Sequence, residues 1–287
     1  DGISAELTAA NEQLAQIDPL RYPEVIQGRE VRSRIVQAQS LSAGANEALT
    51  RYRPVLLRLP SMAGAAEAGR RKYLVLFQND NELRPTGAFL TAYAIINVDK
   101  GKVEAESSDD IYELDKKFTK KEPIPAKLGK YLTTETKFNL RDMNIDPDFK
   151  LSMETFLANY KQIKGQPENI DGIIAVDTEF LKDLMAILGP INVPGYGTFT
   201  TENVPQCDCP QIIYALSEII TRPTPYIREN RKGILGPLMR ELLLRTYGAP
   251  KNQLPQLFET GFNDLLGRHV QMYFFNEEDQ KAAELLD

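Results

Sequence analysis

The chain has 287 residues, of which 42% are hydrophobic, and a formal net charge of -6. A chain of this length buries a large core, as one large domain or as one domain with an appendage. The acidic balance argues against general nucleic-acid binding, because affinity for a phosphate backbone comes mainly from excess Lys and Arg. All apolar runs are far shorter than the ~20 residues that span a bilayer. Since the chain starts at Asp1 without a signal peptide, we expect it to be a soluble piece of a longer protein.

Residues 1–69 have the pattern of helices, with apolar residues spread among polar ones and no strand signal. Four prolines, Pro19, Pro23, Pro54 and Pro60, divide this part into segments. The small residues at 63–69 are typical of a connector. We therefore predict a helical stalk over residues 1–69 and a separate domain over residues 70–287.

From residue 72 onward, strand patterns alternate with helix patterns. Apolar or alternating runs predict strands at 72–78, 88–98, 102–107, 171–177 and 269–275. Helices are predicted at 126–133, 150–164, 179–188, 211–220, 227–247, 254–266 and 277–286, with Gly236-Pro237 interrupting the fifth. This alternation indicates an α/β sandwich with a central sheet.

A polar segment joins the first two predicted strands and carries Asp80, Glu82, Arg84, Pro85 and Gly87. Two interpretations are open. Proteins of the α/β class place ligand-binding groups at the ends of sheet strands. The simpler alternative is a solvated turn in which Pro and Gly act only as turn formers.

Several common active-site patterns are absent from the sequence. It has no phosphate-loop or dinucleotide glycine pattern and no Gly-x-Ser-x-Gly motif. The only histidine, His269, falls on a predicted strand, which argues against a Ser-His-Asp or Cys-His arrangement. Cys207 and Cys209 are the only cysteines, and they form a local disulfide, remain inert thiols or, as a minority interpretation, bind a metal.

Carboxylates and arginines at the ends of predicted elements are the remaining candidates for chemistry. Arginines suit phosphate because the guanidinium group donates in a forked geometry, and the candidates are Arg84, Arg141, Arg228 and Arg231. Carboxylates suit Mg²⁺, which takes oxygen ligands. The aspartates in question are Asp80, Asp109, Asp110, Asp115, Asp142, Asp146 and Asp148. For Arg228 and Arg231, three apart on one helix, the alternative is an ordinary exposed face.

Five motifs together resemble a bacterial family called domain of unknown function four thousand and twelve. They are residues 77–87, residues 140–142 with 147–149, residues 170–177, residues 189–197 and residues 268–275. The resemblance covers Gly69 to the C-terminus, although Ala88 stands where the family pattern has a second glycine. It implies an extracytoplasmic protein of the bacterial cell envelope, anchored by a membrane helix ahead of the stalk.

A more distant resemblance is to the LytR-CpsA-Psr phosphotransferases, which move glycopolymers from a polyprenyl-pyrophosphate lipid onto peptidoglycan. Residues 84–86, 108–112 and 228–232 are similar to three segments of that family. The resemblance implies a three-layer α/β/α sandwich with a central mixed sheet. It also implies that Arg84, Arg228 and Arg231 contact the pyrophosphate, that Asp80 and Asp110 hold magnesium, and that Arg84 and Asp110 are catalytic.

Two positions depart from the phosphotransferase pattern. Thr86 stands where that family has a metal-binding aspartate, and Asp109 stands where it has an arginine. Both changes weaken metal binding and phosphate neutralisation. Our hypothesis is that Arg141 and Asp142 compensate, which adds Arg141 to the pyrophosphate ligands and Asp142 to the metal ligands.

Three functions follow from these observations. The first is binding of a polyprenyl-pyrophosphate-linked glycopolymer, with transfer to the cell wall by magnesium-assisted phosphoryl transfer, and it predicts a long apolar pocket beside Arg84. The alternative is a non-catalytic envelope module that binds polysaccharide or acts as a scaffold, with scattered arginines and no deep pocket. The third is a structural spacer with a large exposed apolar patch. No nucleic-acid partner is expected for any of them.

Overall fold

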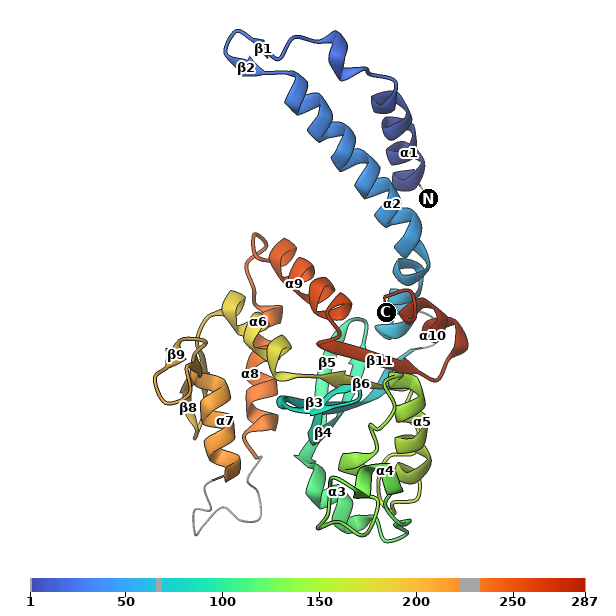
Figure 1. Ribbon diagram of the computed structural model, residues 1–287, viewed down its shortest axis with the longest axis vertical. Helices are drawn as coiled ribbons and strands as arrows, with labels where there is room; N and C mark the ends of the chain where they lie inside the picture. Colours follow the sequence, from blue (N-terminus) through green and yellow to red (C-terminus); the bar gives the residue numbers. More distant parts are fainter. Residues whose placement is uncertain (1, 66–68, 222–232, 287) are drawn as a thin grey trace. The chain divides into compact units, whose positions relative to one another are not determined.

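The computed structural model describes residues 2–65, 69–221 and 233–286. Two compact units make up the chain, residues 1–59 and residues 60–287 (Figure 1). The division falls within one helix, and each unit is described below by itself. Among the described residues, no helix is both long enough and apolar enough to cross a membrane.

The first unit is a helical hairpin with a short β-hairpin between its arms. Its elements are α1 (Gly2–Ala15), the 3-10 turn η1 (Pro19–Arg21), β1 (Val25–Ile26), β2 (Arg29–Glu30) and α2 (Arg32–Met62). The Gln39 side chain on α2 donates to the carbonyl oxygens of Leu14 and Ile17, both at 2.7 Å. The β-hairpin was not predicted. Its turn is Gln27-Gly28, where both residues have positive φ, as a tight hairpin requires.

The helix α2 continues through Pro54 and Pro60, so the prediction that these prolines separate segments is wrong. A proline inside a helix removes one backbone hydrogen bond but does not by itself end the helix. Strong helix formers surround Pro54, namely Arg51, Arg53 and Leu56. The helix ends instead at Met62, before Gly64, which has a φ of 63° and lies so close to the Val98 carbonyl that a side chain has no room.

The second unit is built on a five-stranded sheet in the order β11-β6-β3-β4-β5 (Figure 1). Its strands are β3 (Arg71–Arg84), β4 (Gly87–Asp99), β5 (Lys102–Asp110), β6 (Gly172–Val176) and β11 (Val270–Phe274). The pair β3-β6 is parallel and the other three pairs are antiparallel. The predicted central mixed sheet is therefore confirmed.

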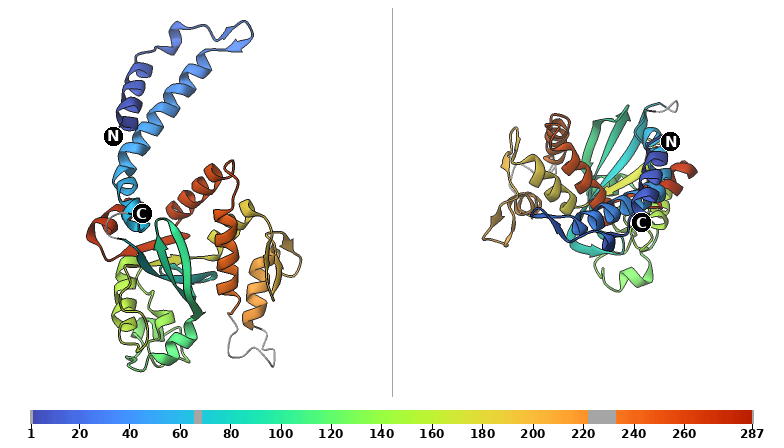
Figure 2. Two further views of the ribbon diagram at one scale, coloured as in Figure 1. Left: turned by 180° about the vertical axis from the view of Figure 1, so that it is seen from behind. Right: turned by 90° about the horizontal axis from the view of Figure 1, so that it is seen from above.

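Both faces of this sheet are covered. In β3, Leu74 and Leu76 belong to one buried cluster, which includes residues of α3 and α5, while Tyr73 and Val75 belong to another, which includes residues of α10 and α8. Successive strand residues point to opposite faces. Figures 1 and 2 show α3 and α5 on the opposite side of the sheet from α8. The arrangement is the three-layer α/β/α sandwich that we predicted.

The helices of this unit correct several predicted boundaries. They are α3 (Ile111–Lys117), α4 (Ala126–Gly129), η2 (Leu140–Asp142), α5 (Phe149–Tyr160), α6 (Thr178–Leu188), α7 (Gln211–Thr221), α8 (Leu235–Tyr247), α9 (Leu254–Leu266) and α10 (Glu277–Ala283). The helix α3 was missed. Of the predicted helix at 227–247, residues 227–232 lie outside the described residues, and α8 begins at Leu235. Pro237 falls in the first turn of α8, where its missing N–H has no helical partner to lose.

A smaller lobe surrounds α6 and α7. Its two-stranded pieces are β7 (Ile191–Val193) with β8 (Gly197–Phe199), and β9 (Asn203–Val204) with β10 (Cys209–Pro210). Met185, Ile191, Phe199 and Ile212 are among its buried side chains. A disulfide joins Cys207 to Cys209 in the turn between β9 and β10, which agrees with the first of the predicted alternatives.

A buried charge network fixes the start of β3. The Arg71 guanidinium contacts Asp171 at 3.0 Å and Asp279 of α10 at 3.7 Å, and it donates to the Ser61 hydroxyl at 2.8 Å. Asp171 also accepts from the backbone N–H of Lys72 at 2.7 Å. The side chains of Arg71 and Asp279 are only 14% and 3% exposed. One arginine thereby joins three segments that are distant in sequence.

Removing this arginine leaves two carboxylates without their cation. We expect Arg71→Met to lower the free energy of unfolding by about 3–5 kcal/mol, because breaking a buried pair leaves an uncompensated charge. The matched control is Arg70→Met, since Arg70 pairs with Glu104 on the surface, where a pair contributes about 0–1 kcal/mol. Urea unfolding of both variants measures the difference. Equal losses would contradict the assignment.

Candidate functional site

The hairpin of β3 and β4 carries the residues that the sequence singled out. The prediction that the strand ends at residue 78 is wrong, because β3 reaches Arg84 and pairs with β4 down to Arg84 and Gly87. Register shifts after Phe77 and Asn79 accommodate the polar residues. The turn is Pro85-Thr86, and Gly87 follows it with a φ of 112°. Arg84 and Thr86 therefore lie at the tip of a hairpin whose turn is exposed at Leu83, Pro85 and Gly87 and buried at Thr86.

Thr86 is held inside the protein by two amides. Its hydroxyl accepts from Gln78 at 3.3 Å and from Asn144 at 2.8 Å, and it is 4% exposed. The Asn144 amide also donates to the Ala88 carbonyl at 2.8 Å. The Oδ1 atom of Asn144 is buried without a hydrogen-bond partner in the described residues. Asn144, two positions after Asp142, thus fixes the backbone around Thr86 and Ala88, two residues that depart from the family patterns.

Arg84 lies against an aromatic ring. Its guanidinium carbon is 4.7 Å from the centre of the Phe89 ring, a cation–π geometry. One terminal nitrogen donates to the Leu83 carbonyl at 3.0 Å, and the other is 4.0 Å from Glu82. The Nε atom is buried and has no hydrogen-bond partner in the part of the chain that the structure describes. This arginine still has donor capacity.

Asp142, in η2, is 3% exposed. Its Oδ2 atom has no hydrogen-bond partner among the described residues, although it is 3.7 Å from Nε of Arg141. Burial raises the pKa of Asp142, an effect that the nearby charges of Arg141 and Arg84 partly offset. A buried carboxylate oxygen without a donor costs folding free energy, so it calls for an explanation.

Arg141 is engaged in structural ion pairs. Its two terminal nitrogens donate at 2.7 Å to Asp115 of α3 and to Glu135. Its guanidinium carbon also lies 4.6 Å from the centre of the Tyr112 ring. The positive charge of Arg141 is therefore already paired with two carboxylates, which weakens its attraction for a phosphate.

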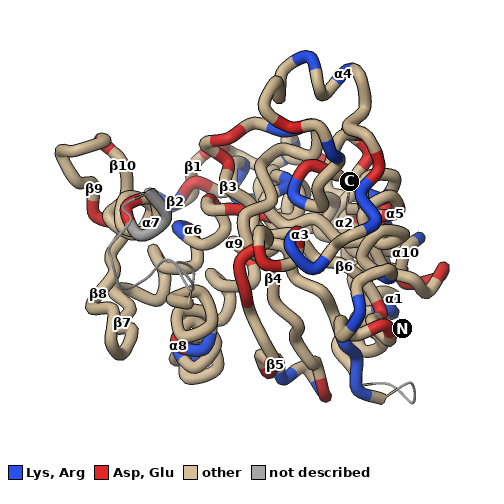
Figure 3. Tube along the Cα trace, turned by 90° about the horizontal axis from the view of Figure 1, so that it is seen from below, with Lys and Arg blue, Asp and Glu red and all other residues tan. Residues whose placement is uncertain are grey.

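Asp110 caps α3, accepting from the backbone N–H of Tyr112 at 3.0 Å. Burial raises the pKa of Tyr112, the charge of Arg141 lowers it in part, and the charges of Asp110, Glu82 and Asp142 raise it. Basic and acidic residues lie side by side around α3 (Figure 3), where Lys116 and Lys117 occupy the last turn.

One predicted site residue lies elsewhere, and two fall outside the described residues. The Asp80 carboxylate accepts from the Thr178 hydroxyl at the start of α6, so it is bound on the α6 side of the hairpin. Arg228 and Arg231 lie outside the described residues. Within the described ranges, no group of three or more His, Cys, Asp or Glu side chains could by itself hold a metal ion.

A second group of titratable side chains surrounds His269. Its Nδ1 atom is 2.8 Å from Oδ2 of Asp177, whose other oxygen caps α6. Although burial lowers the pKa of His269, the hydrogen bond and charge of Asp177 raise it overall. Asp264 of α9, 3% exposed, has a carboxylate oxygen without a partner in the described chain, and burial raises its pKa to about 6.

Arg84 lines neither of two surface hollows in the described structure. One, of about 270 Å³, lies between α6 and α9 and is lined by Asp183, Ala186, Ile187, Gln256, Thr260, Asn263 and Asp264. The other lies within residues 1–59. The long apolar pocket that the first functional hypothesis predicts beside Arg84 is not one of them.

The family model "Protein of unknown function (DUF4012)" matches residues 68–207. The resemblance inferred from the sequence motifs is confirmed over these residues. No curated protein matches the chain.

Several solved structures are similar to the chain. The protein gbs0355 from Streptococcus agalactiae is 13% identical, with a TM-score of 0.43 and coverage of 77% of this chain and 73% of that one. The Lin1025 protein from Listeria innocua is 14% identical, with a TM-score of 0.36 and coverage of 75% and 78%. TagV from B. subtilis is 13% identical, with a TM-score of 0.36 and coverage of 75% and 79%.

The sequence analysis did not single out two side chains that shape this region, Asn144 and Tyr112. A signal for Asn144 was present, because it is a polar residue between the apolar Met143 and Ile145, close to the motif at residues 140–142. Tyr112 lay in a segment taken as a loop. Its role depends on α3, which brings Arg141 over the ring.

We expect substitutions of the two aspartates near Arg141 to have different effects on the free energy of unfolding. Asp115→Asn should lower the free energy of unfolding by about 1–3 kcal/mol, because both of its oxygens accept hydrogen bonds, from Leu140 N–H and from Arg141. Asp142→Asn should leave stability at pH 7 unchanged or higher, because the unpartnered oxygen then carries no charge. Urea unfolding measures both. A loss at Asp142 as large as that at Asp115 would show that the Asp142 carboxylate is structural.

Asp264 should make stability fall as pH rises. Its pKa in the folded protein is raised to about 6, above the value near 3.8 that it has when exposed. The folded form therefore binds its proton more tightly, so stability is greatest below pH 4 and is lost as pH rises to about 6. The full effect is on the order of 3 kcal/mol.

The Asp264→Asn variant removes this dependence. Urea unfolding should show a larger stability gain over the parent at pH 7.5 than at pH 4.5. The control is Glu259→Gln, an exposed position on the same helix. An Asp264→Asn effect that is equal at the two pH values would refute the burial argument.

Proposed function

We propose that the hairpin site binds the pyrophosphate of a polyprenyl-linked glycopolymer at the bacterial cell envelope and transfers the glycopolymer to the cell wall. The observation that carries the proposal is a group of buried polar atoms without hydrogen-bond partners in the described chain, namely Arg84 Nε, Asp142 Oδ2 and Asn144 Oδ1. Unsatisfied polar atoms are costly, and function is one reason to retain them.

The chemistry of these atoms suits a phosphate group with its cation. Arg84 offers an N–H donor and a positive charge to a phosphate oxygen. Asp110 and Asp142, both close to Tyr112, offer carboxylate oxygens. Magnesium is usually held by one or two carboxylates together with substrate phosphates, so a three-carboxylate cage is not required. When bound, Mg²⁺ would neutralise charge on the pyrophosphate.

The residues divide the work of transfer. Arg84 orients the phosphate that carries the sugar, and Asp110 accepts the proton of the acceptor hydroxyl as its oxygen bonds to phosphorus. The bond from that phosphorus to the bridging oxygen breaks, and polyprenyl phosphate leaves. Arg141 maintains the site by holding Asp115 and Glu135 in place.

The proposed location is the extracytoplasmic face of the cell membrane, with an anchor supplied outside these residues. The sequence resemblance to anchored envelope proteins supports this location. The partners are then a glycolipid and the cell-wall polymer that accepts the glycopolymer.

A non-catalytic binding module is the alternative, and two observations favour it. Arg141 is already paired with Asp115 and Glu135. Arg84 also does not line either of the two hollows described above. In this alternative the same hairpin holds an envelope polysaccharide without breaking a bond.

Calorimetric titration with farnesyl pyrophosphate, with and without Mg²⁺, tests the proposal. We expect Arg84→Ala to weaken binding at least tenfold and Asp142→Asn to abolish the enhancement by Mg²⁺. Arg70→Ala is the matched control, because Arg70 is a surface arginine on the opposite end of β3 from Arg84.

The outcomes separate the two functions. Mg²⁺-dependent binding that is lost in Arg84→Ala supports the pyrophosphate site and justifies an assay for polyprenyl phosphate release. Binding of soluble polysaccharide together with no binding of farnesyl pyrophosphate would favour the non-catalytic module. Unchanged binding in Arg84→Ala rules out the hairpin as the pyrophosphate site.

A further inference from the structure

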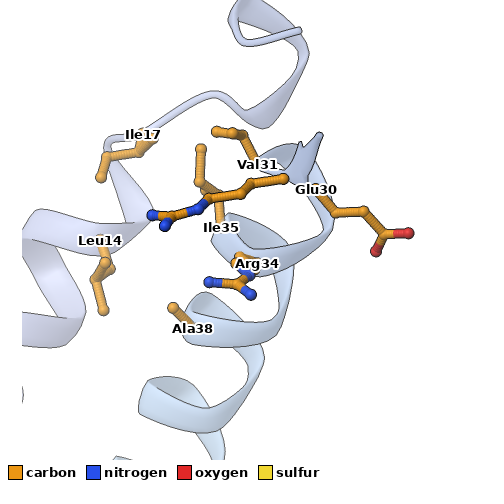
Figure 4. Close-up of a pocket in the computed structure, with 8 residues that line it drawn as sticks. Leu14, Ile17, Glu30, Val31, Arg34, Ile35 and Ala38 are labelled. Carbon is orange, nitrogen blue, oxygen red and sulfur yellow. The ribbon is translucent and has the colours of Figure 1, made fainter. Parts of the chain in front are cut away.

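The first unit contains an apolar hollow of about 290 Å³ between its two arms (Figure 4). Its lining comes from the end of α1 and the start of α2, and comprises Leu14, Ile17, Arg29, Glu30, Val31, Arg34, Ile35 and Ala38. All of these residues belong to the same compact unit. The hollow is therefore a feature of residues 1–59 alone and is separate from the hairpin site of β3 and β4.

The periodicity of the helices explains the apolar lining. Val31, Ile35 and Ala38 are spaced by four and three residues, which places them on one helix face. Leu14 and Ile17 face them from the other arm (Figure 4). Gln39 ties the two arms together, because its amide donates to the carbonyl oxygens of both Leu14 and Ile17.

Two arginines at this hollow have N–H groups that are available to a ligand. Within the described residues, the guanidinium groups of Arg29 and Arg34 make no hydrogen bond or ion pair. The neighbouring arginines differ, since Arg32 donates to the Tyr22 carbonyl and to Glu24, and Arg21 pairs with Asp18. The only acidic residue of the lining, Glu30, accepts from Ser33 and points away from the hollow in Figure 4.

We propose that this hollow binds the alkyl chain of an acidic lipid, with Arg29 and Arg34 contacting its anionic head group. The apolar walls alone would accept any hydrophobic chain, and the two free guanidinium groups select an acidic head. A volume of about 290 Å³ accommodates roughly ten methylene-sized groups at about 30 Å³ each. The ligand class is a single-chain or membrane lipid that carries a phosphate or carboxylate.

Exposed apolar side chains next to the hollow support a lipid over a soluble anion. Leu20, Val25 and Ile26, all in the connection between the arms, are 77%, 54% and 45% exposed. Side chains of this kind gain free energy when they enter an acyl layer. The inference goes beyond the proposed function, because it concerns a different unit and needs no catalysis.

Calorimetric titration of the full chain with dodecyl phosphate below its critical micelle concentration tests the proposal. The titration is done with the Arg84→Ala variant, so that the hairpin site does not contribute. We expect saturable 1:1 binding, weakened at least tenfold by Arg29→Gln with Arg34→Gln. Filling the hollow by Ala38→Phe should abolish binding while both arginines remain.

Three controls define the ligand chemistry. Arg21→Gln with Arg51→Gln removes the same charge from the same unit and should leave the affinity within twofold. Dodecyl maltoside, with the same chain and a neutral head, should bind at least tenfold more weakly than dodecyl phosphate. Inorganic phosphate at millimolar concentration should not bind.

The same variants are then tested on vesicles, which distinguishes a membrane lipid from a free one. The site is assigned to membrane lipid if the protein sediments with phosphatidylglycerol vesicles and not with phosphatidylcholine vesicles, and if this sedimentation depends on Arg29 and Arg34. Binding of dodecyl phosphate without vesicle binding assigns it to a free acidic amphiphile. Equal binding of dodecyl maltoside, no effect of the arginine variants, or no binding at all would overturn the proposal.

Discussion

The structure of the second unit depends on β3 being enclosed on both edges and both faces. Its edges pair with β4 and β6. Its side chains alternate between two cores, with Leu74 and Leu76 on one side and Tyr73 and Val75 on the other. A slip by one residue would exchange the two sets, so the register is strongly fixed. The same register sets the positions of Arg84 and Thr86, because they lie at the end of the β3-β4 hairpin.

Elements marked by a local sequence pattern could be predicted, whereas elements that depend on distant partners could not. Short apolar runs predicted the five strands of the sheet, and the predicted helix at 179–188 differs from α6 by one residue at its start. The extension of β3 beyond residue 78 was missed because its polar residues are paired by β4, a partner that no local pattern reveals. The helix α3 was missed because its lysines gave the pattern of a loop. In physical terms, tertiary pairing and capping outweighed local composition.

In the candidate site, too, contacts between distant segments could not be predicted from the sequence. Sequence reasoning treated Arg84 and Arg141 alike, as forked donors near aspartates. In the fold, Arg141 meets Asp115, which is 26 residues away in the sequence, and Glu135. Among the described residues, Arg84 meets a backbone carbonyl, an aromatic ring and a distant carboxylate. Which arginine remains available for a ligand is set by contacts between segments, and a motif cannot encode them.

The hairpin site and the hollow of the first unit share one property: each has arginine N–H groups that are not used in hydrogen bonds within the described residues. An arginine that is fully paired inside a fold has little left to offer an anion, whereas one that packs on apolar surface keeps its charge and its N–H groups available. Arg84 on Phe89 is one example, and Arg29 and Arg34 beside an apolar hollow are another. In each case positive charge borders apolar surface, which is the complement of a ligand with an acidic head and a hydrocarbon chain. The two proposals therefore name the same class of amphiphile.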